Sequence, residues 1–419
     1  MKSYNDKSAF YAVLVFLIWP LLGLISAFKN YRSRWAKNVL WAFIAFYGFA
    51  FAISSESENS DIVRYVKEYQ DLHKVEMTVV SAENYFKESG EIDVAQSIIA
   101  IVLSRLTDKQ SILMLVYGGI FGFFFSRNMW FVLSHIKGKV KPITIILFAC
   151  FFLVVPIWNI NGFRFWTASH MFIYGVLPYL FEGNKKGLFL CIMTVLVHFA
   201  FIVPVGILLG YLLVGNRLTP FFIFFMVSFF FSQINLTVFN NAIESYAPEI
   251  VQERTSSYRS AEKVEDFRKG AVKKDKVWYA VWYNRALGWS VMGFLVVLFF
   301  KGRPFFMENK RWLSLFSFTL LYSGMANFLS SIPSGGRYRS IALLLALPLI
   351  ILYIQNQKQE TVMERFVWAA IPALLLFIVV STRIGLYSMS ATAVLGNPVI
   401  AFFLDGENIS LNDVMKMVL

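Results

Sequence analysis

Long apolar segments separated by short polar connections recur along the whole chain. Each segment is close to the roughly 20 residues that an α-helix needs to cross the hydrocarbon core of a bilayer. Inside a bilayer every backbone polar group must be bonded within its own segment, so these segments are expected to be helices. The pattern predicts an all-α polytopic membrane protein with one transmembrane domain over residues 1–419. The expected spans are residues 10–28, 37–54, 110–133, 142–159, 164–181, 219–236, 278–300, 311–331, 338–355 and 363–381.

One further apolar run, at residues 187–214, is too long for a single ordinary span. Its centre, VHFAFIVP, contains His198 and Pro204, and a proline interrupts a continuous helix. We therefore expect two short helices that meet at a break, so that the run leaves one side of the membrane and returns to it. With this broken or re-entrant hairpin, the chain makes about twelve crossings.

Lysine and arginine collect in short connections, and this bias predicts the orientation. All the connections would be cytoplasmic, and they share one side only if residues 187–214 cross twice. Both chain termini then lie outside, as do residues 55–109, residues 237–277 and the tail at residues 382–419. The basic connections are residues 29–37, 135–141, 182–186, 215–217 and 301–311.

Two of the outer segments are large enough to contribute to function. Residues 55–109 begin with a stretch in which Asn59 or Ser60 can cap a helix. They continue into an apolar run at residues 92–106 that is too short to span and is expected at the interface or as a re-entrant helix. Residues 237–277 contain both charge signs and are interpreted as an amphipathic or mobile helical loop.

The helix predicted after residue 60 places an acid and two tyrosines on one stripe. Asp61, Tyr65 and Tyr69 lie at positions i, i+4 and i+8. This combination suits a carbohydrate, because tyrosine rings stack on sugar faces and a carboxylate can accept a proton from a sugar hydroxyl. The alternative is a solvated surface helix stabilised by pairs of Arg64 with Glu68 and of Lys67 with Asp71.

The composition agrees with a chain whose main solvent is lipid. Hydrophobic residues make up 57% of the sequence and charged residues only 16%, and there are 44 phenylalanines. The net charge of +13 suits contact with anionic lipid headgroups and does not argue for nucleic acid. Cys150 and Cys191 fall inside predicted spans, where a thiol behaves as a small apolar residue, so we expect neither a disulfide nor a metal ligand.

Ionisable groups at the spans indicate function, because a charge buried in hydrocarbon is costly unless it has a partner or lines a wet cavity. Between Pro142 and Gln233 the only acid is Glu182. A cation-coupled transporter would normally place a carboxylate at mid-membrane, so this pattern disfavours one. Cationic groups near the outer face suit a phosphate or pyrophosphate headgroup. The cationic and histidine residues in or near the spans are Arg164, His170, His198, Arg285, Arg337 and Arg339.

Each of these residues also has a structural interpretation. Arg164 lies at an outer helix start, and Arg337 and Arg339 follow a Gly-Gly loop at another, where helix amino termini favour anions. Arginines at such positions can instead extend toward the lipid headgroups. Arg285, next to Asn284, would join the same cationic cavity or bond to a neighbouring helix.

The two histidines differ in their expected roles. His198, at the apex of the hairpin, could act as a base or donate a hydrogen bond to phosphate, or it could bond to a neighbouring helix. His170 does not share a helix face with Arg164, and we expect it to have a packing role.

Together these residues resemble those of the EpsG group of Wzy-type polysaccharide polymerases, and the resemblance covers most of the chain in layout. The sequence departs from the family pattern in two places. NSD replaces G-x-D before the acid, and Ala200 replaces a small polar residue expected after the histidine. The matching residues are Asp61, Tyr65, Tyr69, Arg164, His198 and Arg337.

The resemblance implies an enzyme of the bacterial inner membrane that joins oligosaccharide repeat units carried on undecaprenyl pyrophosphate at the outer face. Donor and acceptor are both lipid-linked. A chain-length regulator protein would be a possible further partner. Asp61 or His198 would be the catalytic base. Pyrophosphate stabilisation by arginines would need no metal or cofactor, and a single displacement would invert the anomeric carbon. The expected substrate-binding residues are Arg164, Arg337, Arg339, Tyr65, Tyr69 and Arg285.

Three other functions share part of this pattern. A flippase for lipid-linked oligosaccharides would also need a cationic cavity, but two similar halves would be expected and none is found. A ligase resembling the O-antigen ligases shares the chemistry and differs only in its acceptor. A membrane acyltransferase would need a membrane-facing histidine with a nearby acid or arginine.

Overall fold

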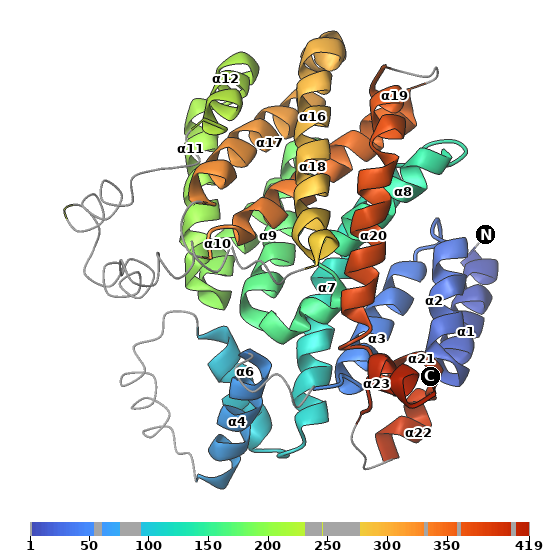
Figure 1. Cartoon of the computed structure of the whole chain (residues 1–419). Helices are drawn as coiled ribbons and strands as arrows, with labels where there is room; N and C mark the ends of the chain where they lie inside the picture. The colour runs from blue at the N-terminus through green and yellow to red at the C-terminus, as the bar shows by residue number, and fades with distance from the viewer. Residues whose placement is uncertain are drawn as a thin grey trace.

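The computed structural model of the chain describes residues 2–53, 61–75, 94–230, 277–330, 334–357, 362–403 and 408–418, and the single residue 245. Within these ranges the regular structure is helical, apart from one isolated β-bridge between Ser390 and Ser410 (Figure 1). The expected all-α class is therefore confirmed. Most of the predicted loop at residues 237–277, and the predicted helix caps Asn59 and Ser60, lie outside the described residues.

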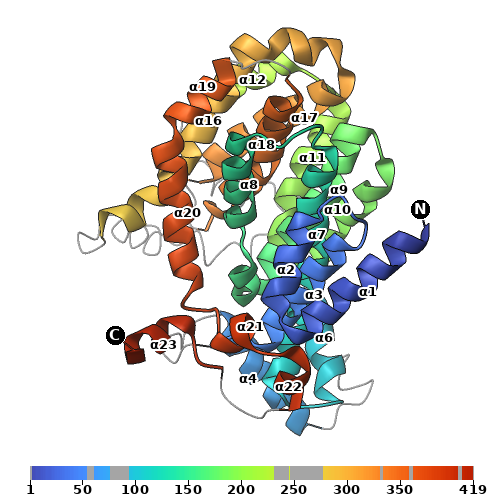
Figure 2. The ribbon, with the colours of Figure 1, turned by 90° about the vertical axis from the view of Figure 1, so that its right-hand side faces the viewer.

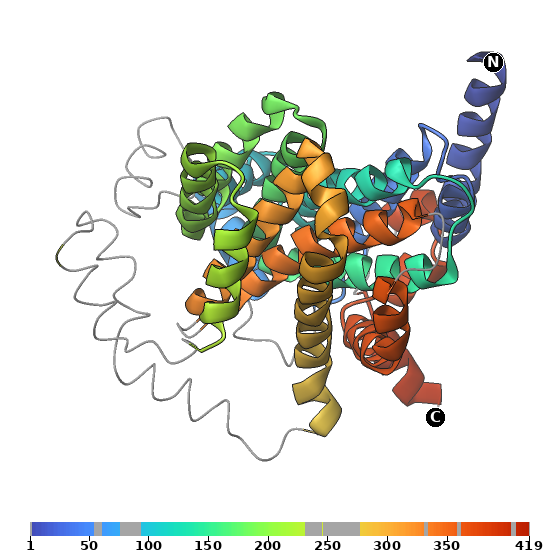
Figure 3. The ribbon, with the colours of Figure 1, turned by 90° about the horizontal axis from the view of Figure 1, so that it is seen from above.

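The helices follow one another as a long series, and the short 3-10 helices η2, η3 and η4 lie between some of them. Seen from above, the yellow α16 and the orange α17 and α18 lie between the green α11 and α12 and the red α20 (Figure 3). The α-helices are α1 (Lys2–Ile18), α2 (Pro20–Lys29), α3 (Ala36–Phe49), α4 (Asp61–Lys74), α6 (Ala95–Ser104), α7 (Gln110–His135), α8 (Pro142–Val154), α9 (Phe163–Glu182), α10 (Leu188–Val197), α11 (Ile202–Val214), α12 (Leu218–Ser228), α16 (Trp278–Glu308), α17 (Lys310–Leu329), α18 (Arg337–Asn356), α19 (Val362–Ala369), α20 (Ile371–Gly385), α21 (Ala391–Leu395), α22 (Pro398–Phe403) and α23 (Leu411–Val418).

Five helical stretches of the described residues are long and apolar enough to cross a membrane, or six when α19 and α20, which meet at a bend of 53°, count as one span. The five are α7, the stretch from α8 to α9, α16, α17 and α18. The prediction of about twelve crossings is not confirmed. Several of the other expected spans are short helices, such as α3 with 14 residues and α12 with 11.

Two predicted boundaries are wrong. The span expected at residues 142–159 ends as α8 at Val154, and the 3-10 helix η2 (Ile157–Gly162) follows Pro156. The basic connection expected at residues 301–311 is largely helical, because α16 continues to Glu308 and only Asn309 separates it from α17.

Contacts link the predicted basic connections and their flanking helices to one another, and we call this region of the helical bundle the basic end. Their common position agrees with the sequence-based topology, and the side of the membrane that this end faces stays a prediction. The contacts that join the connections and their flanking helices are Arg32 Nη2 to the Gly138 carbonyl (2.8 Å), His135 Nε2 to Glu182 Oε1 (3.2 Å), Asn216 Nδ2 to Ser314 Oγ (3.0 Å), Arg303 Nη2 to Thr219 Oγ1 (3.4 Å) and the ring pair Phe181–Trp312 (4.9 Å).

The apolar run at residues 187–214 is a broken hairpin, as predicted. α10 ends at Val197, and His198 has an extended backbone with φ −153° and ψ 119° before η4 (Phe199–Phe201) and α11. Pro204 lies in the first turn of α11, where a missing N–H removes no helical hydrogen bond. Since α10 follows Gly187 and α11 leads into the 215–217 connection, the run starts from the basic end and returns to it.

The expected first span at residues 10–28 is wrong, because the chain folds back at Trp19 and Pro20. A Cβ atom on Gly23 would lie 2.9 Å from Phe16 Cα, whereas residues this far apart in a continuous helix are about 10 Å apart along the axis. Trp35 Nε1 donates to Ser8 Oγ at 3.2 Å, so the start of α1 lies beside the basic connection at residues 29–37 (Figure 2). The side of the membrane on which the amino terminus lies stays a prediction.

The segment expected as a C-terminal tail at residues 382–419 packs against the amino-terminal helices through its described part. Trp19 Nε1 donates to the Val394 carbonyl at 2.5 Å, and Asn397 Nδ2 donates to the Leu17 carbonyl at 2.7 Å. The hydroxyl of Tyr47 donates to the Ser388 carbonyl at 3.3 Å. Segments from the two ends of the chain thus form one packed unit away from the basic end (Figure 1).

Glycine allows α3 and α7 to pack closely. A Cβ atom on Gly48 would lie 2.2 Å from the Met114 carbonyl oxygen, and one on Gly118 would lie 3.1 Å from Gly48 Cα. Even one extra methyl group would therefore force the two helices apart. This packing rigidly supports the bundle on which the candidate site is built.

Candidate functional site

A cavity of about 520 Å³ lies among the helices away from the basic end, and we call it the outer cavity. Arg285 from α16 and Arg339 from the first turn of α18 both line it. Its wall also contains η2, the ends of α8 and α12, and parts of α17 and α20. Two of the arginines singled out in the sequence are therefore brought to one cavity from separate helices.

The outer cavity is cationic. No carboxylate lines it, and within the described ranges no Asp or Glu side chain pairs with Arg285 or Arg339. The Arg285 guanidinium lies 5.7 Å from the ring centroid of Trp282, a contact that does not cancel its charge. Two arginines that share a cavity repel each other, so the arrangement favours an anionic occupant.

Amide and indole groups surround the two arginines. Asn327 is buried, its Nδ2 donates to Ser228 Oγ at 2.9 Å, and its Oδ1 has no hydrogen-bond partner in the described structure. Amides can both donate and accept hydrogen bonds, and indole faces provide flat apolar contact area, so the wall suits a ligand with hydroxyl groups. The asparagines and tryptophans that line the cavity are Asn159, Asn161, Asn284, Asn327, Trp158, Trp166 and Trp289.

The start of α9 projects three consecutive side chains toward three different neighbours. Arg164 contacts Tyr65 of α4, Phe165 contacts His198 and Arg337, and Trp166 lines the outer cavity. Successive residues of a helix point about 100° apart, so one helix start can serve three surfaces. The predicted residues are therefore distributed around the start of α9 and do not converge on a single point.

Arg164 is held by the helix that contains Asp61. Its Nε donates to the Tyr65 hydroxyl at 3.1 Å, and its guanidinium lies 5.6 Å from the Tyr65 ring centroid. Burial raises the pKa of the Tyr65 phenol, an effect that the charge of Arg164 partly offsets. Tyr65 is therefore neutral near neutral pH and provides an oxygen acceptor for the arginine.

Phe165 contacts two other residues of the predicted site, His198 and Arg337. The His198 ring meets it edge-on at 5.3 Å between centroids, and the Arg337 guanidinium lies 5.5 Å from its centroid. Tyr338 donates from its hydroxyl to the Ala200 carbonyl at 2.9 Å and so joins the start of α18 to the break in the hairpin. Of the two arginines in this helix start, Arg337 contacts Phe165 and Arg339 lines the cavity.

The hydrogen bonding of His198 restricts its chemistry. Its Nδ1 accepts a hydrogen bond from the Ala200 N–H at 3.1 Å. A nitrogen that accepts from an N–H is not itself protonated, so the ring is neutral and its proton is on Nε2. In this arrangement His198 is a hydrogen-bond donor, whereas the sequence left both base and donor open.

Asp61 and Tyr69 differ in accessibility. Asp61 Oδ1 lies 3.0 Å from Arg64 Nη2, and its side chain is 45% exposed. Tyr69 is fully buried, and its hydroxyl donates to the Thr107 carbonyl. The predicted stripe is thus oriented toward α6 and α7 over most of its length, and only Asp61 remains open to a ligand. In the same helix Asp71 pairs with Lys74, and not with Lys67 as predicted.

His170 packs inside the bundle, as expected. It is fully buried, Asn128 Nδ2 lies 3.2 Å from its Nδ1, and its Nε2 lies 3.1 Å from the Val155 carbonyl oxygen. Both ring nitrogens are used within the protein, so the residue fixes α9 against α7 and the end of α8. Cys150 and Cys191 are likewise buried and free.

Sequence reasoning missed the amide wall of the outer cavity. Asn159 and Asn161 precede Arg164 in the stretch WNINGFRFW, and a turn containing two amides before a helix start was the available signal. Asn327 and Ser228 are single polar residues in apolar helices, which is a weaker signal. Within the described ranges no three His, Cys, Asp or Glu side chains lie close enough to hold a metal ion; metal independence stays a prediction.

Comparisons with known proteins add no family to these observations. No family model matches the chain, and neither a curated protein nor a solved structure matches it. The resemblance to the EpsG group therefore rests on the residues named above, and the function is argued from the site.

Proposed function

We propose that this protein polymerises oligosaccharide repeat units linked to undecaprenyl pyrophosphate, at the outer face of the bacterial inner membrane. The observation that supports this most is the outer cavity, which combines Arg285 and Arg339 with amides and indoles and has no carboxylate among its described lining residues. Arginines suit a pyrophosphate, and the amide and indole wall suits a sugar. A lipid-linked saccharide contains both chemical groups in one molecule.

In the proposed reaction the cavity binds the donor. An acceptor hydroxyl oxygen attacks the anomeric carbon, the bond from this carbon to the pyrophosphate oxygen breaks, and its electron pair stays on the pyrophosphate. Arg285 and Arg339 stabilise the negative charge that develops on the leaving group, which is the largest electrostatic change in the step. Attack from the face opposite the leaving group inverts the anomeric carbon.

The acceptor is proposed to bind between α4 and the start of α9. Asp61 is the best candidate for the base that removes the hydroxyl proton, because it is partly exposed, whereas His198 Nδ1 already accepts a hydrogen bond. Arg164 and Tyr65 would position this side of the site through their mutual hydrogen bond. His198 would donate from Nε2 to a phosphate or sugar oxygen.

The test uses purified protein in nanodiscs with lipid-linked repeat unit and a chelator. The wild type should form a ladder of products, and Arg285→Ala should lose about 100-fold or more of this activity, the usual effect of removing a group that stabilises an oxyanion. Arg303→Ala is the matched control, because Arg303 is on the same helix at the basic end and should leave activity unchanged.

Other outcomes identify the alternatives. Movement of the lipid-linked substrate across the bilayer without a new glycosidic bond would indicate a flippase. Transfer of one finished glycan to a different acceptor, without a ladder, would indicate a ligase. If folded wild-type protein gives none of these products, the proposal for the outer cavity is wrong.

A further inference from the structure

A second cavity of about 520 Å³ lies at the basic end, and we call it the inner cavity. It is formed by the connection before α3, by α7 and by α9, and it shares no lining residue with the outer cavity. The residues that line it are Tyr31, Arg32, Ser33, Arg34, Lys37, Arg127, Asn128, Trp130, Phe131, Leu133, Ser134, Ile136, Tyr174 and Pro178.

Four cationic side chains meet in the inner cavity, and no carboxylate is among the described residues that line it. Arg32, Arg34 and Lys37 come from the 29–37 connection and the first turn of α3, and Arg127 comes from α7. Across residues 20–50, 110–141 and 163–182, which contain every lining residue, the only acid is Glu182. Its Oε1 lies 3.2 Å from His135 Nε2, so it pairs outside the cavity.

Arg127 is positioned by neutral partners. Its guanidinium carbon lies 4.1 Å from the ring centroid of Phe123 and 4.8 Å from that of Trp41. It donates to Ser126 Oγ and to Asn38 Oδ1, each at 2.8 Å. These bonds use two of the five guanidinium N–H groups, and no acid in the described part of the chain pairs with the charge.

Further contacts fix the shape of the cavity. Arg32 Nη2 donates to the Gly138 carbonyl at 2.8 Å, and Trp130 Nε1 donates to the Tyr31 carbonyl at 2.9 Å. These bonds join the 29–37 connection to α7 and to the connection that follows α7. α3 begins at Ala36, so the positive end of its helix dipole adds to the field.

We propose that the inner cavity binds a phosphate group, supplied by an anionic phospholipid or as free phosphate. A phosphate offers charge and several acceptor oxygens to three arginines and a lysine, and this pairing would remove the mutual repulsion of the four cations. The adjacent helix α2 exposes Leu22 and Ile25, which suits the acyl chains of a lipid. The proposal is independent of the reaction at the outer cavity.

The experiment measures binding in detergent by native mass spectrometry with phosphatidylglycerol, and by calorimetry with inorganic phosphate. We expect retained phosphatidylglycerol on the wild type, and about 10-fold weaker binding by the double variant Arg34→Gln/Lys37→Gln, the effect of losing one to two good charge contacts. The matched control is Lys137→Gln/Lys139→Gln, which removes two exposed charges from the neighbouring connection outside the cavity and should bind as the wild type does.

Each result decides the proposal. Binding of inorganic phosphate with the same variant pattern, but not of the lipid, supports the site with free phosphate as the source. Equal weakening by both double variants indicates general attraction to the basic end and overturns the site, as does absence of binding to either probe. If the Arg34→Gln/Lys37→Gln protein has a lower thermal midpoint without lipid, Arg32→Gln repeats the comparison from a different residue of the same wall.

Discussion

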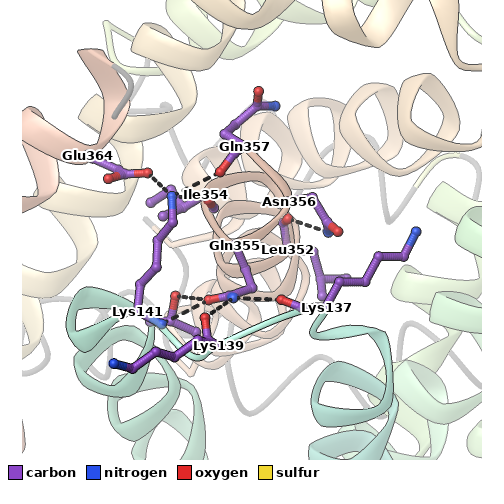
Figure 4. A network of polar contacts seen from close by, with 10 residues as sticks. Lys137, Lys139, Lys141, Leu352, Ile354, Gln355, Asn356, Gln357 and Glu364 are labelled. Carbon is purple, nitrogen blue, oxygen red and sulfur yellow. Dashed lines mark hydrogen bonds and ion pairs between the residues drawn. The ribbon is translucent and has the colours of Figure 1, made fainter. Parts of the chain in front are cut away.

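Two cationic regions of the helical bundle differ in whether an acid within the protein pairs with their charges. At the basic end, Lys141 pairs with the buried carboxylate of Glu364 and also donates to the Ile354 and Gln357 carbonyls at 3.0 and 3.1 Å (Figure 4). At the other end, Arg285 and Arg339 share a cavity, and none of the described residues that line it is an acid. Lys141 thus has an acid and two carbonyls of the protein as partners, whereas the two arginines are available to a ligand.

This contrast separates structural charge from charge available to a ligand. Removing a charge from water is costly, so the buried Glu364 carboxylate depends on a partner within the protein. Arg285 and Arg339 are exposed, so water or a ligand can serve as their partner. Gln355 belongs to the same network as Lys141: its Nε2 donates to the carbonyls of Lys137 and Lys139, each at 2.9 Å, and its Oε1 accepts from Thr144 at 2.9 Å.

The largest effect is expected when the ion pair of Lys141 and Glu364 is broken. Lys141→Ala should lower the free energy of unfolding by about 3–5 kcal/mol, because the buried Glu364 carboxylate would lose the ammonium group that it pairs with. Thermal unfolding in detergent measures the change. Lys139→Ala, an exposed neighbour, should have little effect, and the double variant Lys141→Met/Glu364→Leu should recover most of the loss. An unaltered midpoint for Lys141→Ala would show that the ion pair does not contribute.

In the outer cavity, replacing an arginine by alanine should leave stability unchanged and remove activity. Arg339→Ala should reduce the rate of polymerisation about 100-fold, equivalent to about 2.7 kcal/mol, by removing a stabilising group from the leaving pyrophosphate. Its thermal midpoint should be equal to or above that of the wild type, because one of two like charges is gone. A lower midpoint with full activity would show that Arg339 stabilises the fold and does not act on the leaving group.

A smaller effect is expected when Tyr65 of α4 is changed. Tyr65→Phe removes the acceptor of Arg164 and should lower activity about 5-fold, in the range of one hydrogen bond of about 1 kcal/mol. Because burial raises the folded-state pKa of Tyr65, its unfolded form loses a proton first as pH rises past about 10, and this residue's stabilisation is lost there. Tyr65→Phe should therefore soften the alkaline fall in stability, which pH-dependent unfolding would detect.

The smallest effect tests the same stripe one turn later. Tyr69→Phe loses the hydroxyl bond to the Thr107 carbonyl and should cost about 1 kcal/mol of stability with no change in polymerisation rate. Comparison of this variant with Tyr65→Phe in both assays separates packing from substrate positioning. A rate loss in Tyr69→Phe at equal folded fraction would return Tyr69 to the site.

Sequence patterns predicted local elements well where a single helix decided the outcome. α7 and α9 begin and end within two residues of the predicted spans, and the break at His198 is present. The span at residues 10–28 failed because the pattern is equally apolar on both sides of Trp19, and only the contact of Gly23 with Phe16 reveals the fold-back. The amide wall was missed because single asparagines in apolar helices have no fixed spacing to recognise.

The sequence by itself determined that the chain is helical and apolar, and that cations outnumber acids in and near its spans, because these properties belong to each segment alone. Only the tertiary structure decided which cations are paired. Arg337 and Arg339 are two residues apart, yet one stacks on Phe165 and the other lines the outer cavity. The physical reason is that a side chain's partners depend on the faces that neighbouring helices present, and those faces come from segments far apart in the chain.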